Sequence, residues 1–149
     1  MQSVRDADGT RYLLVKRSAE SSLVRDPTTG EERYLANDDL ESVGESPLSA
    51  AAGGLVPDLR RAVLACRDER ALGLLVEFAD RGPLSVRTLL DSYDLCESDL
   101  HGLLAEFRAA GLITETTVAG ERGYEPTGAT TTVVERFRDC PADPAGVPL

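Results

Sequence analysis

Three amphipathic stretches between residues 67 and 110 form the clearest pattern of apolar and polar positions in the chain. In the third stretch the apolar side chains stand at positions 100, 103, 104 and 107. This i, i+3, i+4, i+7 spacing places them on one face of an α-helix. Gly111 follows directly, and glycine readily takes the left-handed conformation that ends a helix. The pattern therefore predicts a helix over residues 96–110 with one buried face.

Shorter helical patterns precede this stretch. One begins after Pro57, and a second begins after Asp68, a residue type that caps helix N-termini. The second pattern ends at Gly82-Pro83, and Ser85 can cap the helix that follows. The predicted buried stripes of the three helices are Leu59, Ala62, Val63 and Cys66 in the first, Leu72, Leu75, Val76 and Ala79 in the second, and Val86, Leu89 and Leu90 in the third.

The residues after Gly111 change from helical to alternating periodicity. Residues 112–118 are rich in Thr, Ile and Val and predict a strand, residues 119–123 predict a hairpin tip, and residues 124–126 predict the return strand. Thr127 is a possible cap for a last helix that runs through Phe137. Val133, Val134 and Phe137 are expected to share its buried face.

The N-terminal part of the chain predicts β structure. Turn signals at Asp8-Gly9 and at 26–30 separate short apolar runs, which together predict a small antiparallel meander. The expected organisation is a β meander over 1–42 with strands at 11–17, 23–25 and 33–35, a linker over 43–57, a helical and hairpin domain over 58–139, and a flexible tail over 140–149.

From Arg67 to about Thr127 the order of these signals resembles ArsR- and MarR-like winged helix-turn-helix transcriptional regulators, and most of all their haloarchaeal relatives. The residues that carry the resemblance are Asp68-Glu69-Arg70-Ala71-Leu72-Gly73-Leu74-Leu75, Gly82-Pro83-Leu84-Ser85-Val86 and Ala110-Gly111-Leu112-Ile113. The resemblance implies an α+β fold, a winged helix-turn-helix domain with the N-terminal β meander attached. It also implies that helix 96–110 lies in the DNA major groove and that the wing at 118–124 follows the backbone or the minor groove.

Six side chains are the candidate contacts to double-stranded DNA under this hypothesis: Ser85, Arg87, Ser98, His101, Arg108 and Arg122. Each has a simpler interpretation as well. Arg87 can pair with Asp91 one helical turn later, and Arg108 can pair with Glu106, with Asp99 or with the wing. Arg122 and His101 can be ordinary exposed side chains. Gly102 and Ala105 occupy positions where a DNA-reading helix commonly carries basic residues.

The charge of the chain opposes simple DNA binding. The whole sequence has 26 acidic and 16 basic residues and a net charge of −10, and residues 67–139 hold eight Arg against fourteen Asp and Glu, a net charge of −6. Phosphate contacts from Lys and Arg dominate DNA affinity. The acidic, lysine-poor composition is, however, typical of cytosolic proteins of salt-in halophilic archaea. High salt screens repulsion, because the Debye length falls to about 3 Å at 1 M ionic strength.

Other functional classes receive little support. No apolar run is long enough to span a membrane, and the first residues lack the apolar core of a secretory signal, so a cytoplasmic protein is expected. Cys66, Cys96 and Cys140 are too far apart for a zinc site, and Cys96 is interpreted as a buried, inert thiol with redox sensing as the alternative. No catalytic motif, cofactor-binding loop or metal motif is present, so we expect neither an enzyme nor a cofactor.

Two functional hypotheses follow. The first is a DNA-binding transcriptional regulator, a homodimer joined through 128–139 or through the N-terminal meander. The second is an adaptor, in which the same fold binds another protein because Gly102 and Ala105 leave a smooth face on helix 96–110.

Overall fold

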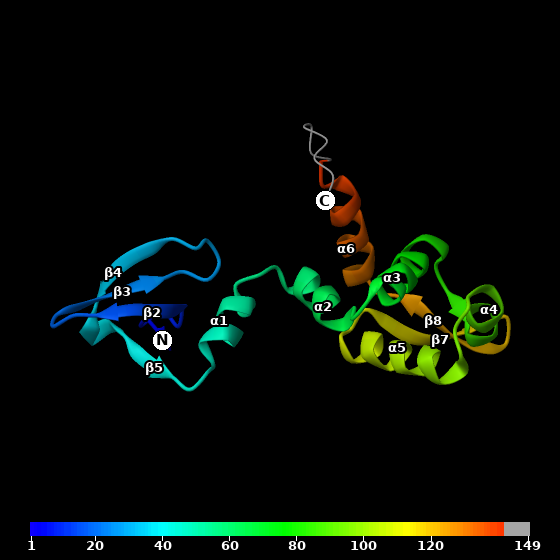
Figure 1. Cartoon of the computed structure of the whole chain (residues 1–149), viewed down its shortest axis with the longest axis horizontal. Helices are drawn as coiled ribbons and strands as arrows, with labels where there is room; N and C mark the ends of the chain where they lie inside the picture. The colour runs from blue at the N-terminus through cyan, green and yellow to red at the C-terminus, as the bar shows by residue number, and fades with distance from the viewer. Residues whose placement is uncertain (142–149) are drawn as a thin grey trace. The chain divides into compact units, whose positions relative to one another are not determined.

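The computed structural model describes residues 1–141 and has an α+β architecture (Figure 1). Contacts divide the chain into an N-terminal unit, Met1–Pro57, and a C-terminal unit, Asp58–Leu149. Over the described residues the chain forms six α-helices and two antiparallel sheets. The tail expected over 140–149 lies almost wholly outside the described residues.

The N-terminal unit is built on a five-stranded antiparallel sheet with the strand order β4-β3-β2-β1-β5. The first four strands form a meander, and β5 returns to pair with β1. A single turn of 3-10 helix, Asn37–Asp39, joins β4 to β5. The strands are β1 (Gln2–Arg5), β2 (Arg11–Arg17), β3 (Ser21–Arg25), β4 (Glu32–Ala36) and β5 (Glu41–Val43). The predicted meander is therefore confirmed and is extended beyond β2 by two further strands, β1 and β5.

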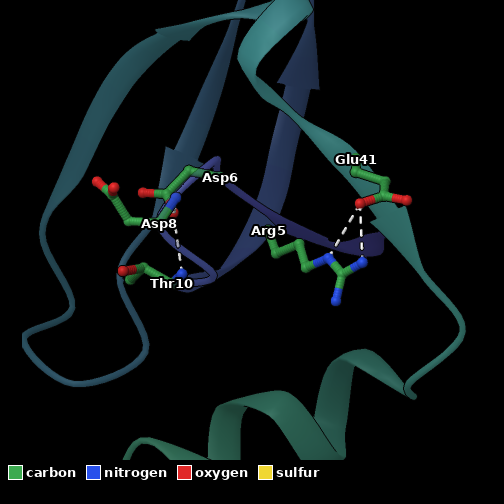
Figure 2. A network of polar contacts seen from close by, with 5 residues as sticks. All are labelled: Arg5, Asp6, Asp8, Thr10 and Glu41. Atoms are coloured by element: carbon green, nitrogen blue, oxygen red, sulfur yellow. Dashed lines mark hydrogen bonds and ion pairs between the residues drawn. The ribbon is translucent and has the colours of Figure 1, made fainter.

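Polar contacts fix the start of this sheet (Figure 2). The Asp6 carboxylate accepts hydrogen bonds from the backbone N–H groups of Asp8 and Thr10, at 3.0 and 2.9 Å, and so closes the turn between β1 and β2. Beside it, the Arg5 guanidinium donates through Nε and Nη2 to Glu41 Oε2, at 3.0 and 2.9 Å. This ion pair joins β1 to β5, the two strands that the sequence pattern did not predict.

The two faces of the N-terminal sheet are covered differently. One face holds a core of Val4, Tyr12, Leu14 and Val24. Helix α1 (Pro47–Gly53) contacts β1 and β2. A Cβ on Gly54, at the end of α1, would lie 2.2 Å from the carbonyl oxygen of Pro27, so only glycine allows this close approach to the β3–β4 turn. The stretch 43–57 is thus not the expected linker, because its Pro47 starts a helix that packs on the sheet.

The C-terminal unit alternates helices with a small sheet of order β6-β8-β7 (Figure 1). Both strand pairs in this sheet are antiparallel. Ala119 and Gly120 both have positive φ, which is the requirement of a two-residue type I′ turn between β7 and β8. The elements are α2 (Pro57–Ala65), α3 (Glu69–Arg81), β6 (Leu84–Ser85), α4 (Val86–Ser92), α5 (Glu97–Ala109), β7 (Ile113–Val118), β8 (Glu121–Pro126) and α6 (Gly128–Asp139).

The predicted buried faces are partly right. On α5, Leu100, Leu104 and Phe107 are buried and Leu103 packs at their edge, as the periodicity predicted. On α3 the predicted stripe is right at Leu75 but wrong at Leu72, which is 40% exposed. The buried side of α3 consists of Ala71, Leu74, Leu75 and Phe78. Val63 on α2 and Phe137 on α6 are also exposed, at 66% and 47%. Each of these helices has more apolar positions than its single packed face can bury.

Helix ends follow the predicted capping residues. The Asp68 carboxylate accepts from the N–H of Ala71 at 2.9 Å, and the Ser85 hydroxyl accepts from the N–H of Thr88 at 3.0 Å. Gly111 has a φ of +73° and ends α5. Thr127 does not cap α6 through its side chain. Its hydroxyl instead donates to the carbonyl oxygen of Gly111 at 2.7 Å.

Two further hydrogen bonds hold the same junction. The Thr127 N–H donates to the carbonyl oxygen of Leu112 at 3.0 Å, and the buried Thr130 hydroxyl donates to that oxygen at 2.5 Å. The residues that follow α5 are therefore joined to the first turn of α6 by backbone and side-chain hydrogen bonds. Leu112 itself is fully buried.

Candidate nucleic-acid interface

The exposed face of α5 and the β7–β8 hairpin carry most of the side chains that were predicted from the sequence to contact DNA. Ser98, His101 and Arg108 are exposed on α5, and Arg122 lies on β8. Arg87 is exposed on α4, the helix before α5. Five of the six residues that the sequence predicted to contact DNA therefore lie exposed on α4, α5 or β8.

Ser85 is the exception and is corrected here. It is 4% exposed and ends β6, where it pairs with Gly123 of β8. Its hydroxyl accepts from the Thr88 N–H and bonds the Thr88 hydroxyl at 2.9 Å. A buried hydroxyl with both partners in its own helix start is not available to a phosphate group. Its helix-capping role, also expected from the sequence, is the one that the structure supports.

Two arginines converge where α5 meets the hairpin. Arg108 Nη2 lies 3.8 Å from Glu115 Oε2, and Arg122 Nε lies 3.4 Å from Glu115 Oε1. Both guanidinium groups also lie over the ring of buried Tyr124, at 5.9 and 5.8 Å from its centroid. Two cations thus share one carboxylate and one aromatic ring. We call Arg108, Glu115 and Arg122 the helix–hairpin cluster, which carries a formal charge of +1.

The other cationic candidates are each matched by one carboxylate. Arg87 Nε lies 3.3 Å from Glu121 Oε1, which ties α4 to the hairpin tip. His101 Nε2 lies 3.6 Å from Glu97 Oε1, one helical turn away. Arg87 does not take the partner that sequence proximity predicted, whereas Arg108 pairs with the β7–β8 hairpin, where the sequence predicted the wing, one of its three expected alternatives. Outside the helix–hairpin cluster, the residues predicted to contact DNA therefore add no net positive charge to this surface.

The start of α5 is acidic. Cys96 is its N-cap, and Glu97 and Asp99 lie in its first turn, where negative charge stabilises the helix dipole. The Cys96 thiol is exposed and accepts from the N–H of Asp99 at 3.4 Å, so the expectation that it is buried is wrong.

The sequence did not reveal a cavity of about 370 Å³ between α3 and the turn that joins α4 to α5. Residues one and two helical turns apart on α3 form one wall, and the α4–α5 turn forms the other. The lining residues are Arg70, Leu74, Glu77, Tyr93, Asp94 and Leu95. Detecting such a cavity requires knowing how the turn packs on α3, which no local pattern encodes.

Tyr93 links that turn to α3. Its hydroxyl donates a short hydrogen bond to Glu77 and accepts one from Arg81 Nη1 at 2.6 Å. Partial burial and the hydrogen bond to Glu77 raise the pKa of the Tyr93 hydroxyl, so it stays protonated as a donor. A smaller hollow of about 250 Å³ lies nearby, lined by Ser98 and Gly102 of α5 together with Arg67, Asp68, Arg70, Asp99 and Leu103.

Residues 1–141 hold no cluster of three or more His, Cys, Asp or Glu side chains placed to bind a metal ion. This part of the chain also contains no helix with both the length and the apolar character that a membrane crossing requires. Burial and the nearby Asp68 carboxylate raise the pKa of the Cys66 thiol, which opposes formation of its reactive thiolate.

Comparison with known proteins gives one match. The model of a family of unknown function, DUF7346, matches residues 1–138 and so runs through both units. No curated protein and no solved structure matches the chain. Because the family model covers the N-terminal sheet, the C-terminal helices and the hairpin between α5 and α6, the chain belongs to the family of unknown function DUF7346.

Proposed function

We propose that the C-terminal unit is a winged helix-turn-helix domain and that the protein binds double-stranded DNA as a homodimeric transcriptional regulator. The order α3, β6, α4, α5, β7, β8 supports this assignment, with α5 as the recognition helix and the β7–β8 hairpin as the wing. The acidic, lysine-poor composition further supports an origin in a halophilic archaeon with a salt-rich cytoplasm.

The observation that carries the proposal is the helix–hairpin cluster. Arg108 comes from the proposed recognition helix and Arg122 from the proposed wing, and both lie against the same Glu115 and Tyr124. A DNA backbone that passes between helix and wing would meet two guanidinium groups with one carboxylate between them. Phosphate oxygens compete for guanidinium groups through charge-assisted, bidentate hydrogen bonds.

The acidic residues near the helix–hairpin cluster determine the salt concentration at which DNA can bind. At about 1 M salt the Debye length is near 3 Å, so Glu97 and Asp99 repel phosphates only at close range. Direct contacts from Arg108 and Arg122 persist at this range. The proposal therefore predicts binding that tolerates high KCl better than the net charge of the chain implies.

A salt-titrated binding measurement tests the proposal. Genomic DNA fragments are bound to the full-length protein at increasing KCl, with Arg108→Ala, Arg122→Ala and Arg61→Ala as variants. Arg61 lies on α2 and is the matched control, since it is exposed and outside both the cluster and the segment 128–139. Loss of one phosphate contact should weaken binding uniformly across sequences and reduce the salt slope by about 1. Equal binding by all three variants would contradict the proposal.

A protein-binding adaptor is the second candidate, and the paired charges favour it. Each nominated arginine has a carboxylate within 4 Å, and the hollow beside Ser98 and Gly102 offers a place for a partner's side chain. If no fragment binds at any KCl concentration and a protein co-purifies with the chain, the adaptor is the better account. The cavity beside Tyr93 would then be a further contact region on the same unit.

A further inference from the structure

The cations without carboxylate partners are not where the DNA hypothesis would place them. Among residues 1–141, six of the sixteen Lys and Arg side chains have no carboxylate within 4 Å. Two lie in the C-terminal unit, Arg60 and Arg136. The other four lie on three adjacent strands of the N-terminal unit: Lys16 and Arg17 on β2, Arg25 on β3 and Arg33 on β4.

Strand register shows which of these cations share a face. Lys16 pairs with Leu23, and Leu23 pairs with Tyr34, so these three stand in one row across β2, β3 and β4. Arg25 lies two residues after Leu23 and therefore points to the same side. Val24 between them is buried in the core on the opposite side. We call Lys16, Leu23, Arg25 and Tyr34 the β2–β4 face; its three strands lie side by side in Figure 1.

Arg33 and Arg17 do not belong to this face. Arg33 pairs with Val24 and turns toward the core side, where its Nη2 donates to the Tyr12 hydroxyl at 2.5 Å and its guanidinium lies 5.1 Å from the Tyr12 ring centroid. Arg17 is the last residue of β2 and pairs with Ser22. The β2–β4 face therefore has two cations, one half-buried leucine and one tyrosine. On the same side of the sheet, Arg25 lies between buried Leu13 on β2 and Glu32 on β4.

Tyr34 is the most exposed aromatic side chain in the described part of the chain. Its exposed fraction is 62%, whereas Tyr12 and Tyr124 are 3% and 2% exposed. It lies on the edge strand β4, and its partner on the neighbouring strand is Leu23. A β-bulge between Leu14 and Lys16 turns the end of β2 and changes the register there, which brings Lys16 into the row of Tyr34.

We propose that the β2–β4 face binds single-stranded nucleic acid, with Tyr34 stacking on a base while Lys16 and Arg25 contact the flanking phosphates. An exposed aromatic ring on the edge strand, with cations on the two adjacent strands, offers both interactions that sequence-tolerant single-strand binding uses. A duplex buries its base faces in the stack and gives Tyr34 no ring to meet. An acidic peptide satisfies the two cations but leaves the tyrosine without a specific partner. This site is separate from the proposed duplex site on α5 and the wing.

The acidic residues of the N-terminal unit determine how strongly the β2–β4 face attracts phosphates. Glu32 pairs with Arg25 in register, although no ion pair forms between them, so one carboxylate stands at the border of the face. Glu41 and Glu45 are occupied by Arg5 and Arg11. Stacking on Tyr34 does not depend on charge and persists at high salt. Two phosphate contacts give a single-strand salt slope of about −1.4, far shallower than that of a basic protein with many contacts.

The experiment measures fluorescence anisotropy of labelled oligothymidylate and oligouridylate, each about 12 nucleotides long, with the full-length protein across a KCl series. A duplex of the same length is the comparison ligand. Tyr34→Ala should weaken single-strand binding by about tenfold, and Tyr34→Phe should retain it, since the ring remains. Lys16→Gln should reduce the salt slope by about 0.7. Because Tyr34 and Lys16 are exposed, these variants should keep the wild-type melting temperature.

The control variants separate this site from the proposed duplex site. Arg122→Ala should leave single-strand binding unchanged, and Tyr34→Ala should leave duplex binding unchanged. The proposal is overturned if Tyr34→Ala binds both oligonucleotides as the wild type does. It is also overturned if polyglutamate displaces them at equal charge concentration with the same dependence on Tyr34, because the face would then recognise anionic polymers in general.

Discussion

Arg138 on α6 and Asp80 on α3 form a two-pronged ion pair in which Nη1 lies 2.7 Å from Oδ1 and Nη2 lies 2.7 Å from Oδ2. Hydrogen bonding to Arg138 lowers the pKa of the Asp80 carboxyl. The pair joins the C-terminal ends of two helices that also share core contacts through Phe78 and Val133. It is the longest-range connection in sequence among the side-chain hydrogen bonds of the described residues.

This pair gives a pH-dependent contribution to stability. Because the folded pKa of Asp80 is lowered, its contribution is fully present above the ordinary aspartate pKa of about 3.9 and is lost as pH falls through the folded pKa. Asp80→Asn should therefore unfold at lower urea than the wild type at pH 7, and the difference should disappear as pH falls through the lowered pKa of the Asp80 carboxyl. Glu135→Gln on the same helix is the control. A difference that is independent of pH would contradict this assignment.

Removal of the shared carboxylate in the helix–hairpin cluster should strengthen the proposed DNA binding. Glu115→Gln leaves Arg108 and Arg122 without their common anion, so both guanidinium groups become available to phosphates. We expect higher affinity for duplex DNA and a steeper salt dependence, measured by anisotropy over a KCl series. Glu125→Gln on β8 is the matched control. Weaker binding by Glu115→Gln would mean that the carboxylate is needed to position the two arginines.

Two glycines of the C-terminal unit should respond oppositely to substitution by alanine. A Cβ on Gly123 would lie 2.7 Å from the Leu84 carbonyl oxygen and 2.7 Å from Val118 Cγ2, so Gly123→Ala must disturb the β6–β8 pairing. Overpacking of this kind costs about 1–3 kcal/mol. Gly102 lies within α5 and has open space around it, so Gly102→Ala should stabilise the unit by about 0.5–1 kcal/mol. Thermal unfolding of both variants checks the signs.

Two buried serines of the N-terminal sheet form a second matched pair. Ser3 is 1% exposed, and its hydroxyl has no hydrogen-bond partner within residues 1–141. Ser3→Ala should therefore leave stability unchanged or raise it by up to about 1 kcal/mol. Ser22 is fully buried, but its hydroxyl bonds Asn37 Oδ1 at 2.5 Å. Ser22→Ala should cost about 1–2 kcal/mol because it leaves the Asn37 oxygen unpaired. Urea unfolding measures both; equal effects would refute the contrast.

Local sequence signals predicted the C-terminal elements well because each signal depends only on residues within one helical turn of it. Asp68 and Ser85 cap the helices that they were expected to cap, and Gly111 ends α5 in the left-handed region. The strands β1 and β5 escaped detection because each is short and has few apolar positions. They form through backbone pairing with a neighbour, which is distant in sequence for β5.

Side-chain partners were predicted less well, because they are set by tertiary packing. Arg87 was expected to pair with Asp91 four residues later, but its partner is Glu121 across the hairpin. Of the three alternatives for Arg108, Glu106 and Asp99 pair with Arg67 and Arg70 instead, and the hairpin supplies its partner through Glu115. An acidic chain offers several carboxylates to every arginine. The choice among them depends on which strands and helices meet, which periodicity does not determine.

The three hydrogen bonds from Thr127 and Thr130 to the carbonyl oxygens after α5 have a mechanical consequence. Because these hydrogen bonds hold the segment after α5 against the first turn of α6, a rotation of α5 should also move α6. A ligand or partner subunit that binds α6 would therefore change the angle at which α5 is presented.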